Sequence, residues 1–298
     1  MEFVYLNGRL VDSAQAHVSV HDAGLLHGVG LFETMRSYGG RTFRLAEHLD
    51  RLYRSAGQLG IRIRHGSGQL GEWVAALLEA NDLQDARLRL TVTRGNVQRA
   101  DPDDEPSSEV FLTAGPMTPY PPEYYRRGMT VMVSDYKANP AEPTAGHKTL
   151  NYFSRLLMLQ EAQKKQAGEA LWFTPANRLA SGCVSNVFVV RGGVLLTPPA
   201  EKPVLPGITR RTVLDLARDQ GIVGEQRWLT IQELLGADEV FLTNSIMELM
   251  PVCRIERHAV GQDKPGPVYT KLHEAYRQLV RAECGSRPPQ QPTAENER

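Results

Sequence analysis

The chain has 298 residues, of which 41% are hydrophobic and 23% charged, and its formal net charge at pH 7 is zero. This length is ample for a large core and favours two modest domains over one very large one. The balanced charge argues against a nucleic-acid binder, which needs a basic excess or a basic face. The sequence contains no run of about 18 apolar residues, so we expect no membrane span.

The targeting and redox signals favour a cytoplasmic protein. The start, MEFVYLNGRLVD, lacks a basic region followed by an apolar run, so we expect no signal peptide. The three cysteines, Cys183, Cys253 and Cys284, are scattered and odd in number, which predicts neither a disulfide framework nor a metal site. The eight histidines show no paired spacing with carboxylates or cysteines, so we expect no bound metal.

The first 116 residues predict a small α+β domain. An Asn-Gly pair within residues 3–12 is a strong hairpin signal, and a Gly-Gly pair within residues 30–45 predicts a second hairpin. Apolar residues at helical spacing predict helices over 45–60 and 69–80. The segments RLRLTVTRG and EVFLTAG predict strands on either side of a polar loop at 96–108.

The segment PMTPYPP holds four prolines in seven residues, which cannot continue a helix or a central strand, so it predicts a domain boundary. After it we expect a strand (MTVMVSDY), a helix over about 150–167, and a hairpin-like set (ALWFTP, VSNVFVV, GGVLLTP). A helix after LPGITR, a strand (EVFLTN) and a final helix over about 268–284 follow. The predicted division is a small domain at 1–116, a Pro-rich linker at 117–122, a larger domain at 123–285 and a disordered tail at 286–298.

Lys148 stands in GHKTLNYF, at the junction between a loop and the helix expected over about 150–167. Most lysines are solvated surface charges, so a single lysine is a weak signal of chemistry. A lysine that forms a Schiff base must reach a buried aldehyde and spend time deprotonated, which desolvation favours. By its position alone, Lys148 is only a candidate for that role.

Two segments offer groups that would bind a phosphate. In LPGITR a turn precedes a helix start at Ile208 and Thr209, whose free backbone N–H groups suit an anion; an ordinary capped helix start is the alternative. The strand EVFLTN ends in Thr243-Asn244-Ser245, three small polar residues that offer hydroxyl, amide and backbone donors. A polar β-turn is the alternative there.

Arg51, in EHLDRLYRSA, has two interpretations. It would either reach inward from the helix as a phosphate ligand, or pair on the solvated helix surface with Glu47, one turn earlier. Taken alone, the helix-surface pair is the favoured interpretation.

Together these pieces resemble one family. The ordered motifs YLNGRLV, HGVGLFETMRSYGGRTFRLAEHLDRL, HKTLNYFSRLLMLQEA, GCVSNVFVVRGGVLLTP, LPGITR and DEVFLTNSIMELMPV are similar to those of the class IV pyridoxal-phosphate enzymes, from about residue 3 to 255. This family includes branched-chain aminotransferases, D-amino-acid aminotransferases and aminodeoxychorismate lyases. The resemblance implies an α+β, two-domain class IV aminotransferase fold, with a larger mixed α/β domain that binds the cofactor, and a homodimer.

The resemblance also implies roles for single residues. Lys148 would form the internal aldimine with pyridoxal 5′-phosphate and then act as the proton-shuttling base. The residues expected to bind the cofactor phosphate are Arg51, Ile208, Thr209, Asn244 and Ser245. Tyr152 would lie beside the ring hydroxyl of the cofactor and Asn186 close to its ring. The residues expected to shape the substrate pocket are Phe32, Arg94 and Arg99.

Ser181 departs from the family pattern. The family usually has a glutamate just before this Gly-x-x-x-Asn motif, paired with the pyridine nitrogen of the cofactor, and ASGCVSNVF puts Ser181 in its place. A carboxylate keeps that nitrogen protonated, which makes the ring an electron sink, whereas a serine hydroxyl does not stabilise the charge comparably. Either another group compensates, or the chemistry needs a weaker sink, or the chain is a poorly active member.

Three functions are consistent with this resemblance. The first is transfer of the amino group of a small amino acid, with branched-chain amino acids as candidates, to a 2-oxo acid. The second is an aminodeoxychorismate lyase that releases pyruvate and 4-aminobenzoate: the Thr-Asn-Ser-Ile-Met run resembles lyases, whereas Glu248 and KTLNY resemble transaminases. The D-amino-acid type is least favoured, because Phe32 and Asp101 replace its tyrosine and histidine. The third function is that of a homologue that holds the cofactor but does not turn over a substrate.

Overall fold

The structure, a computed structural model, describes residues 2–96 and 108–285. Residues 97–107, which include Arg99 and most of the predicted polar loop, and the tail predicted at 286–298 lie outside the described residues. The described chain divides into two compact units. Unit 1 takes the described residues of Met1–Thr118, His147–Asn151 and Val280–Pro288, and unit 2 those of Pro119–Gly146 and Tyr152–Leu279.

One boundary between the units lies within the proline-rich segment, after Thr118. The units also exchange a short segment later in the chain. The first helix of unit 2 begins at Pro122, inside the predicted linker, where proline suits the first helical turn. The segment His147–Asn151 belongs to unit 1, although it lies within the range expected for the larger domain. The reason is backbone pairing with the first unit, described below, which composition and periodicity do not reveal.

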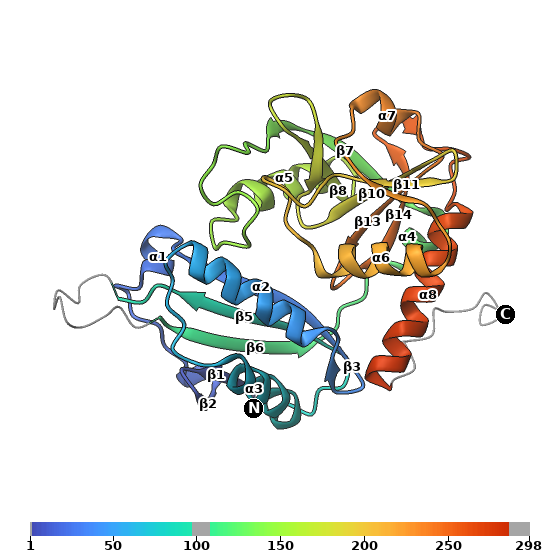
Figure 1. Ribbon diagram of the computed structural model, residues 1–298. Helices are drawn as coiled ribbons and strands as arrows, with labels where there is room; N and C mark the ends of the chain where they lie inside the picture. The colour runs from blue at the N-terminus through green and yellow to red at the C-terminus, as the bar shows by residue number, and fades with distance from the viewer. Residues whose placement is uncertain (1, 97–107, 286–298) are drawn as a thin grey trace. The chain divides into compact units, whose positions relative to one another are not determined.

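Unit 1 is built on a six-stranded sheet with the strand order β2-β1-β6-β5-β3-β4 (Figure 1). Its strands are β1 (Phe3–Leu6), β2 (Arg9–Asp12), β3 (Gly30–Tyr38), β4 (Arg41–Thr42), β5 (Ala86–Thr93) and β6 (Val110–Pro116), and its helices are α1 (Ala23–His27), α2 (Leu45–Gln58) and α3 (Ser67–Ala80). Both predicted hairpins are confirmed. At the first, Asn7 and Gly8 have φ of 49° and 83°, the left-handed pair that a two-residue turn requires.

The core of unit 1 lies between the sheet and helices α2 and α3. Leu31 and Met35 of β3 pack there with Leu52 of α2 and Leu77 of α3, and each of these side chains is at most 2% exposed. Because side chains alternate along a strand, Glu33 lies on the same face of β3 as Leu31 and Met35. A carboxylate is therefore placed inside an apolar core, facing α2.

Unit 2 is built on a nine-stranded sheet, with β15 paired to β14 beside the order β12-β11-β10-β13-β14-β7-β8-β9. Its strands are β7 (Met129–Lys137), β8 (Glu169–Phe173), β9 (Leu179–Gly182), β10 (Asn186–Arg191), β11 (Val194–Thr197), β12 (Gly224–Gln226), β13 (Glu239–Asn244), β14 (Glu248–Ile255) and β15 (His258–Ala259). Its helices are α4 (Pro122–Arg127), α5 (Phe153–Lys164), α6 (Ile208–Asp219) and α7 (Ile231–Leu235), and α8 (Pro267–Cys284) continues into unit 1. None of the helices in the described ranges is long and apolar enough to cross a membrane.

Two features of this sheet differ from the sequence prediction. The ALWFTP strand, β8, does not form a hairpin with the 186–191 strand; it pairs with β7 and with β9, a strand that the sequence did not predict. Strand β14 was also missed. It lies inside the sheet between β13 and β7, although it contains Pro251, which is paired with Phe241. Proline usually marks an edge or a strand end, so the local pattern argues against this strand.

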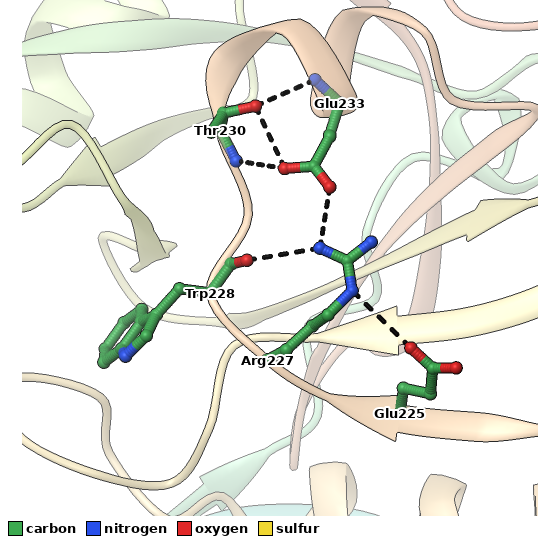
Figure 2. A network of polar contacts seen from close by, with 5 residues as sticks. All are labelled: Glu225, Arg227, Trp228, Thr230 and Glu233. Atoms are coloured by element: carbon green, nitrogen blue, oxygen red, sulfur yellow. Dashed lines mark hydrogen bonds and ion pairs between the residues drawn. The ribbon is translucent and has the colours of Figure 1, made fainter.

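Helix α7 begins with a capping box (Figure 2). The Thr230 hydroxyl accepts from the backbone N–H of Glu233, and the Glu233 carboxylate accepts from the backbone N–H of Thr230 at 2.8 Å. Arg227 donates to that carboxylate at 2.6 Å and to the carbonyl of Trp228, and it also pairs with Glu225. The Thr230 backbone and Arg227 together lower the pKa of Glu233 to about 2.

Candidate active site

The segment that carries Lys148 is fixed to strand β3 by backbone pairing. The N–H of Phe32 donates to the carbonyl of Lys148 at 2.9 Å, and the N–H of Leu150 donates to the carbonyl of Gly30 at 3.0 Å. A Cβ on Gly30 would lie 2.5 Å from the carbonyl oxygen of Val92 and 2.6 Å from Leu150 Cδ1, so only glycine permits this approach. The lysine backbone therefore has a defined position on the sheet of unit 1.

The side chain of Lys148 lies against Phe32. Its Nζ is 4.4 Å from the centroid of the buried Phe32 ring, and the guanidinium carbon of Arg89 is 3.8 Å from the same centroid. A cation over an aromatic face is attracted by the ring quadrupole. Phe32, predicted to shape the substrate pocket, is thus brought next to Lys148. The neighbouring His147 ring bonds the Ser55 hydroxyl at 3.0 Å, which ties the segment to α2.

Arg51 is buried and held by a carboxylate that sequence reasoning missed. Its Nε and Nη2 donate to the two oxygens of Glu33 at 2.8 and 2.5 Å, and Nδ1 of His48 donates to Glu33 Oε2 at 2.8 Å. The interpretation of Arg51 as a solvated helix-surface residue is wrong, because it is only 6% exposed; Glu47 accepts a hydrogen bond from Arg44 instead. The signal available in the sequence was an acidic residue within the apolar run of β3.

The protonation states of this cluster follow from its partners. Burial raises the pKa of Glu33, but the charge of Arg51 and hydrogen bonds from His48 and Arg51 outweigh it and lower the pKa to about 2. Burial lowers the pKa of His48, so the neutral ring donates through Nδ1 to the carboxylate. The Glu33 carboxylate is therefore ionised, and it fixes the Arg51 guanidinium in one orientation.

In unit 2, the start of α6 is packed tightly against Asn186. The Asn186 side chain donates to the carbonyl of Leu205 at 3.0 Å, and a Cβ on Gly207 would lie 2.0 Å from Asn186 Oδ1. Gly207 is the N-cap of α6 and makes no side-chain cap, so the first N–H groups, at Ile208 and Thr209, have no partner within the helix. These N–H groups and the positive end of the helix form a site suited to a phosphate.

The end of strand β13 adds polar groups beside this helix start. Thr243 pairs with Asn186 in register, so the two side chains share a face of the sheet. The Thr243 hydroxyl is buried and has no hydrogen-bond partner among the described residues. The Asn244 side chain donates to the carbonyl of Val184 and accepts from two N–H groups of the following turn, so it orders the turn that carries Ser245.

The loop after Ser181 connects the remaining predicted residues. The Tyr152 hydroxyl donates to the carbonyl of Cys183 at 3.2 Å. Glu169, fully buried under this loop, accepts from the backbone N–H groups of Cys183 and Val184 and from the Ser185 hydroxyl. Tyr152, Ser181, Asn186 and Asn244 are thus linked within unit 2 through one short loop, residues 182–185.

Arg94 is exposed just after β5, and its backbone N–H donates to the carbonyl of Val29 at 3.1 Å. The structure thus places Phe32, Arg51 and Lys148 in unit 1, and the other predicted ring and phosphate residues in unit 2. Arg99 lies outside the described residues. No cluster of three or more metal-ligating side chains occurs in the described ranges.

A family model described as amino-transferase class IV matches residues 30–255. The chain is 37% identical over 277 residues to a putative branched-chain-amino-acid aminotransferase of Methanocaldococcus jannaschii, covering 93% of this chain and 96% of that protein. It is 31% identical over 281 residues to a D-alanine aminotransferase of Bacillus licheniformis, covering 94% and 98%.

The fold is also similar to solved structures. The branched-chain amino acid aminotransferase of Thermobaculum terrenum, in its pyridoxal-phosphate form, matches with a TM-score of 0.84 at 27% identity, over 94% of each chain. These findings confirm the predicted fold and the pyridoxal-phosphate cofactor, and they give the lyase alternative no support over an aminotransferase. The chain belongs to the class IV aminotransferase family.

Proposed function

We propose that this aminotransferase moves the amino group of a small amino acid, of the branched-chain type, to a 2-oxo acid, and that Lys148 is the residue that holds the cofactor. The observation that carries this proposal is the position of Lys148. Its backbone is paired with β3, and its Nζ lies over the buried ring of Phe32. The apolar ring beside the amine suits a substrate with a hydrocarbon side chain. The similarity to the putative branched-chain-amino-acid aminotransferase supports the same substrate class.

The residues present fit pyridoxal phosphate. In unit 2, a doubly charged phosphate suits the N–H groups at the start of α6 and the Thr243 hydroxyl, which has no hydrogen-bond partner among the described residues. In unit 1, the guanidinium of Arg51, which Glu33 holds in place, has the charge that a phosphate requires. The hydroxyl of Ser245 and the turn ordered by Asn244 add to this set. Tyr152, Ser181 and Asn186 would contact the ring.

The cofactor supplies an aldehyde that condenses with amines and a ring that withdraws electrons from the substrate α-carbon. Lys148 would hold the cofactor through Nζ, and its amine, once free, would accept the proton that leaves the substrate α-carbon and return it. Its backbone pairing with β3 holds Lys148 in one position, which would lower the entropic cost of the proton transfer.

We infer that the protein acts as a homodimer. Two helices leave large apolar side chains uncovered: Phe153 and Leu156 of α5 are 75% and 48% exposed, and Leu25 and Leu26 of α1 are 65% and 48% exposed. Grouped apolar side chains of this size mark protein interfaces. Light scattering during gel filtration should give twice the chain mass of 33.2 kDa. A mass of one chain at micromolar concentration would contradict a stable dimer.

We also propose that the protein is cytoplasmic. Cys183, Cys253 and Cys284 are free thiols and all are buried, which suits a reducing compartment. Fractionation of the cells that make the protein should recover it with cytoplasmic enzymes, and recovery from a secreted or periplasmic fraction would contradict this.

The half-reaction tests the proposed substrate class. Purified protein is loaded with pyridoxal phosphate, and its visible spectrum is followed as single amino acids are added. Leucine, isoleucine or valine should convert the lysine-bound band to the pyridoxamine form. If D-alanine converts it and the branched-chain amino acids do not, the substrate assignment is wrong. If only aminodeoxychorismate reacts, with release of pyruvate, the protein is a lyase.

A further inference from the structure

Ser181 is in contact with a cation, where the family usually has a glutamate. Arg155, in the first turn of α5, directs one guanidinium nitrogen, Nη1, toward the end of β9. This Nη1 is 3.4 Å from Ser181 Oγ, 2.9 Å from the carbonyl oxygen of Gly182 and 3.2 Å from that of Cys183. Ser181 itself is only 4% exposed. The polar group at this position is thus a buried hydroxyl that accepts a hydrogen bond from a half-buried guanidinium.

Within the described ranges, no carboxylate forms an ion pair with Arg155. Its guanidinium carbon lies 5.5 Å from the centroid of the Trp172 ring and 6.0 Å from that of the Tyr152 ring. Glu169 is the buried acid of this region, but the N–H groups and the hydroxyl of residues 183–185 occupy its two oxygens. It supports the loop and does not replace the missing glutamate.

The charge of Arg155 restricts what Ser181 can bind. A guanidinium has only N–H donors, so Ser181 Oγ accepts from Arg155 through one lone pair and keeps its proton to donate. In the structure that proton goes to the carbonyl of Gly182 at 2.9 Å. A pyridine nitrogen at this place would receive the proton through its lone pair. A protonated pyridine would instead bring a second positive charge to the hydroxyl that already accepts from Arg155, and a neighbouring like charge disfavours protonation.

We propose that Arg155 and Ser181 keep the ring nitrogen of pyridoxal phosphate unprotonated, through the chain Arg155 N–H to Ser181 Oγ and Ser181 O–H to the ring nitrogen. This inference rests on the proposed function, which puts Ser181 beside that nitrogen. Ser181 contacts the cofactor, and Arg155 is a positioning residue that acts through it. The ring is then a weaker electron sink, so negative charge at the substrate α-carbon is stabilised less and proton transfer depends more on Lys148.

The protonation of the nitrogen is measured directly by NMR. The full chain is loaded with pyridoxal phosphate labelled with ¹⁵N in the ring, and the visible spectrum first establishes that the cofactor is bound to lysine. The wild-type resonance should lie at the position of neutral pyridine at neutral pH. In the double variant Arg155→Gln/Ser181→Glu, which restores a carboxylate and removes the cation, it should move to the pyridinium position. Arg127→Gln, whose side chain is 85% exposed on α4, is the matched control and should leave the resonance unchanged.

The outcomes separate this inference from the proposed function. A lysine-bound spectrum with a pyridinium resonance in the wild type overturns the role of Arg155 and Ser181 and leaves the aminotransferase assignment standing. The wild-type measurement decides this even if the double variant does not fold. A neutral resonance that persists in a well-folded double variant shows that other groups set the protonation, and this also overturns the role. If no lysine-bound spectrum forms, both proposals fail.

Discussion

The carboxylate of Glu33 accepts two hydrogen bonds from the guanidinium of Arg51, from Nε at 2.8 Å and from Nη2 at 2.5 Å, inside the core between β3 and α2. Both side chains are almost completely buried. A pair of this kind costs free energy to desolvate, so its value is less in stability than in the fixed orientation of the guanidinium.

Replacing Glu33→Gln should damage both stability and cofactor binding. It leaves Arg51 as a buried charge without its counter-ion, which should lower the free energy of unfolding by roughly 3–5 kcal/mol. The guanidinium also loses its orientation, so the affinity for pyridoxal phosphate should fall by about tenfold or more, equal to about 1.4 kcal/mol. Urea unfolding and spectral titration with the cofactor measure the two effects.

Glu47→Gln is the control for that variant. Glu47 lies on α2, the helix that carries Arg51, but it is partly exposed and pairs with Arg44 near the surface. Its loss should change stability by no more than about 1 kcal/mol and leave cofactor affinity unaltered. Equal effects of the two substitutions on cofactor affinity would contradict an orienting role for Glu33.

Gly207→Ala should disturb the start of α6. The added methyl group would lie 2.0 Å from Asn186 Oδ1, so either the asparagine or the helix start must shift, at a cost of about 1–3 kcal/mol. Affinity for pyridoxal phosphate should fall as the N–H groups at Ile208 and Thr209 move. Gly57→Ala, in α2 with no atom near its added methyl group, should instead gain about 0.5–1 kcal/mol. Unchanged cofactor affinity in Gly207→Ala would count against a phosphate site at α6.

The capping box of α7 should make stability depend on acid pH through Glu233. The folded state lowers the pKa of Glu233 from 4.5 to about 2. A depressed pKa stabilises the folded state above pH 4.5, and this contribution is lost as the pH falls toward 2. The difference in unfolding free energy between wild type and Glu233→Gln should therefore shrink over that window.

The same experiment on Glu225→Gln provides the comparison. Glu225 pairs with the same Arg227 but is 53% exposed and lies outside the capping box, so its removal should cost less. A constant difference between wild type and Glu233→Gln at every pH would show that the Glu233 carboxylate does not stabilise the cap.

Local signals in the sequence predicted much of the fold. The hairpin at Asn7-Gly8 follows from the left-handed conformation that these two residues adopt readily, and helix α2 follows from its apolar spacing. Strand β14 was missed because Pro251 argues against a strand in the local pattern, whereas pairing with neighbouring strands of the sheet stabilises it. Such pairing is a tertiary effect that outweighs local preference.

The candidate site was predicted less completely, for a similar reason. Lys148 was identified through the motif that it shares with a family, whereas its pairing with β3 joins residues more than a hundred positions apart. Glu33 and Arg155 were not predicted as partners of Arg51 and Ser181, because each pair is brought together only by folding. Contacts of this kind have no periodic signal in a single sequence.

The measurement that tests the central claim most directly is the location of the cofactor on the chain. The protein loaded with pyridoxal phosphate is treated with borohydride, which converts the link to lysine into a stable bond, and is then digested and analysed by mass spectrometry. The cofactor mass should be found on Lys148 alone, and Lys148→Ala should bind the cofactor without forming the link. A cofactor attached mainly to another lysine, or a lysine-bound spectrum that persists in Lys148→Ala, would contradict the assignment.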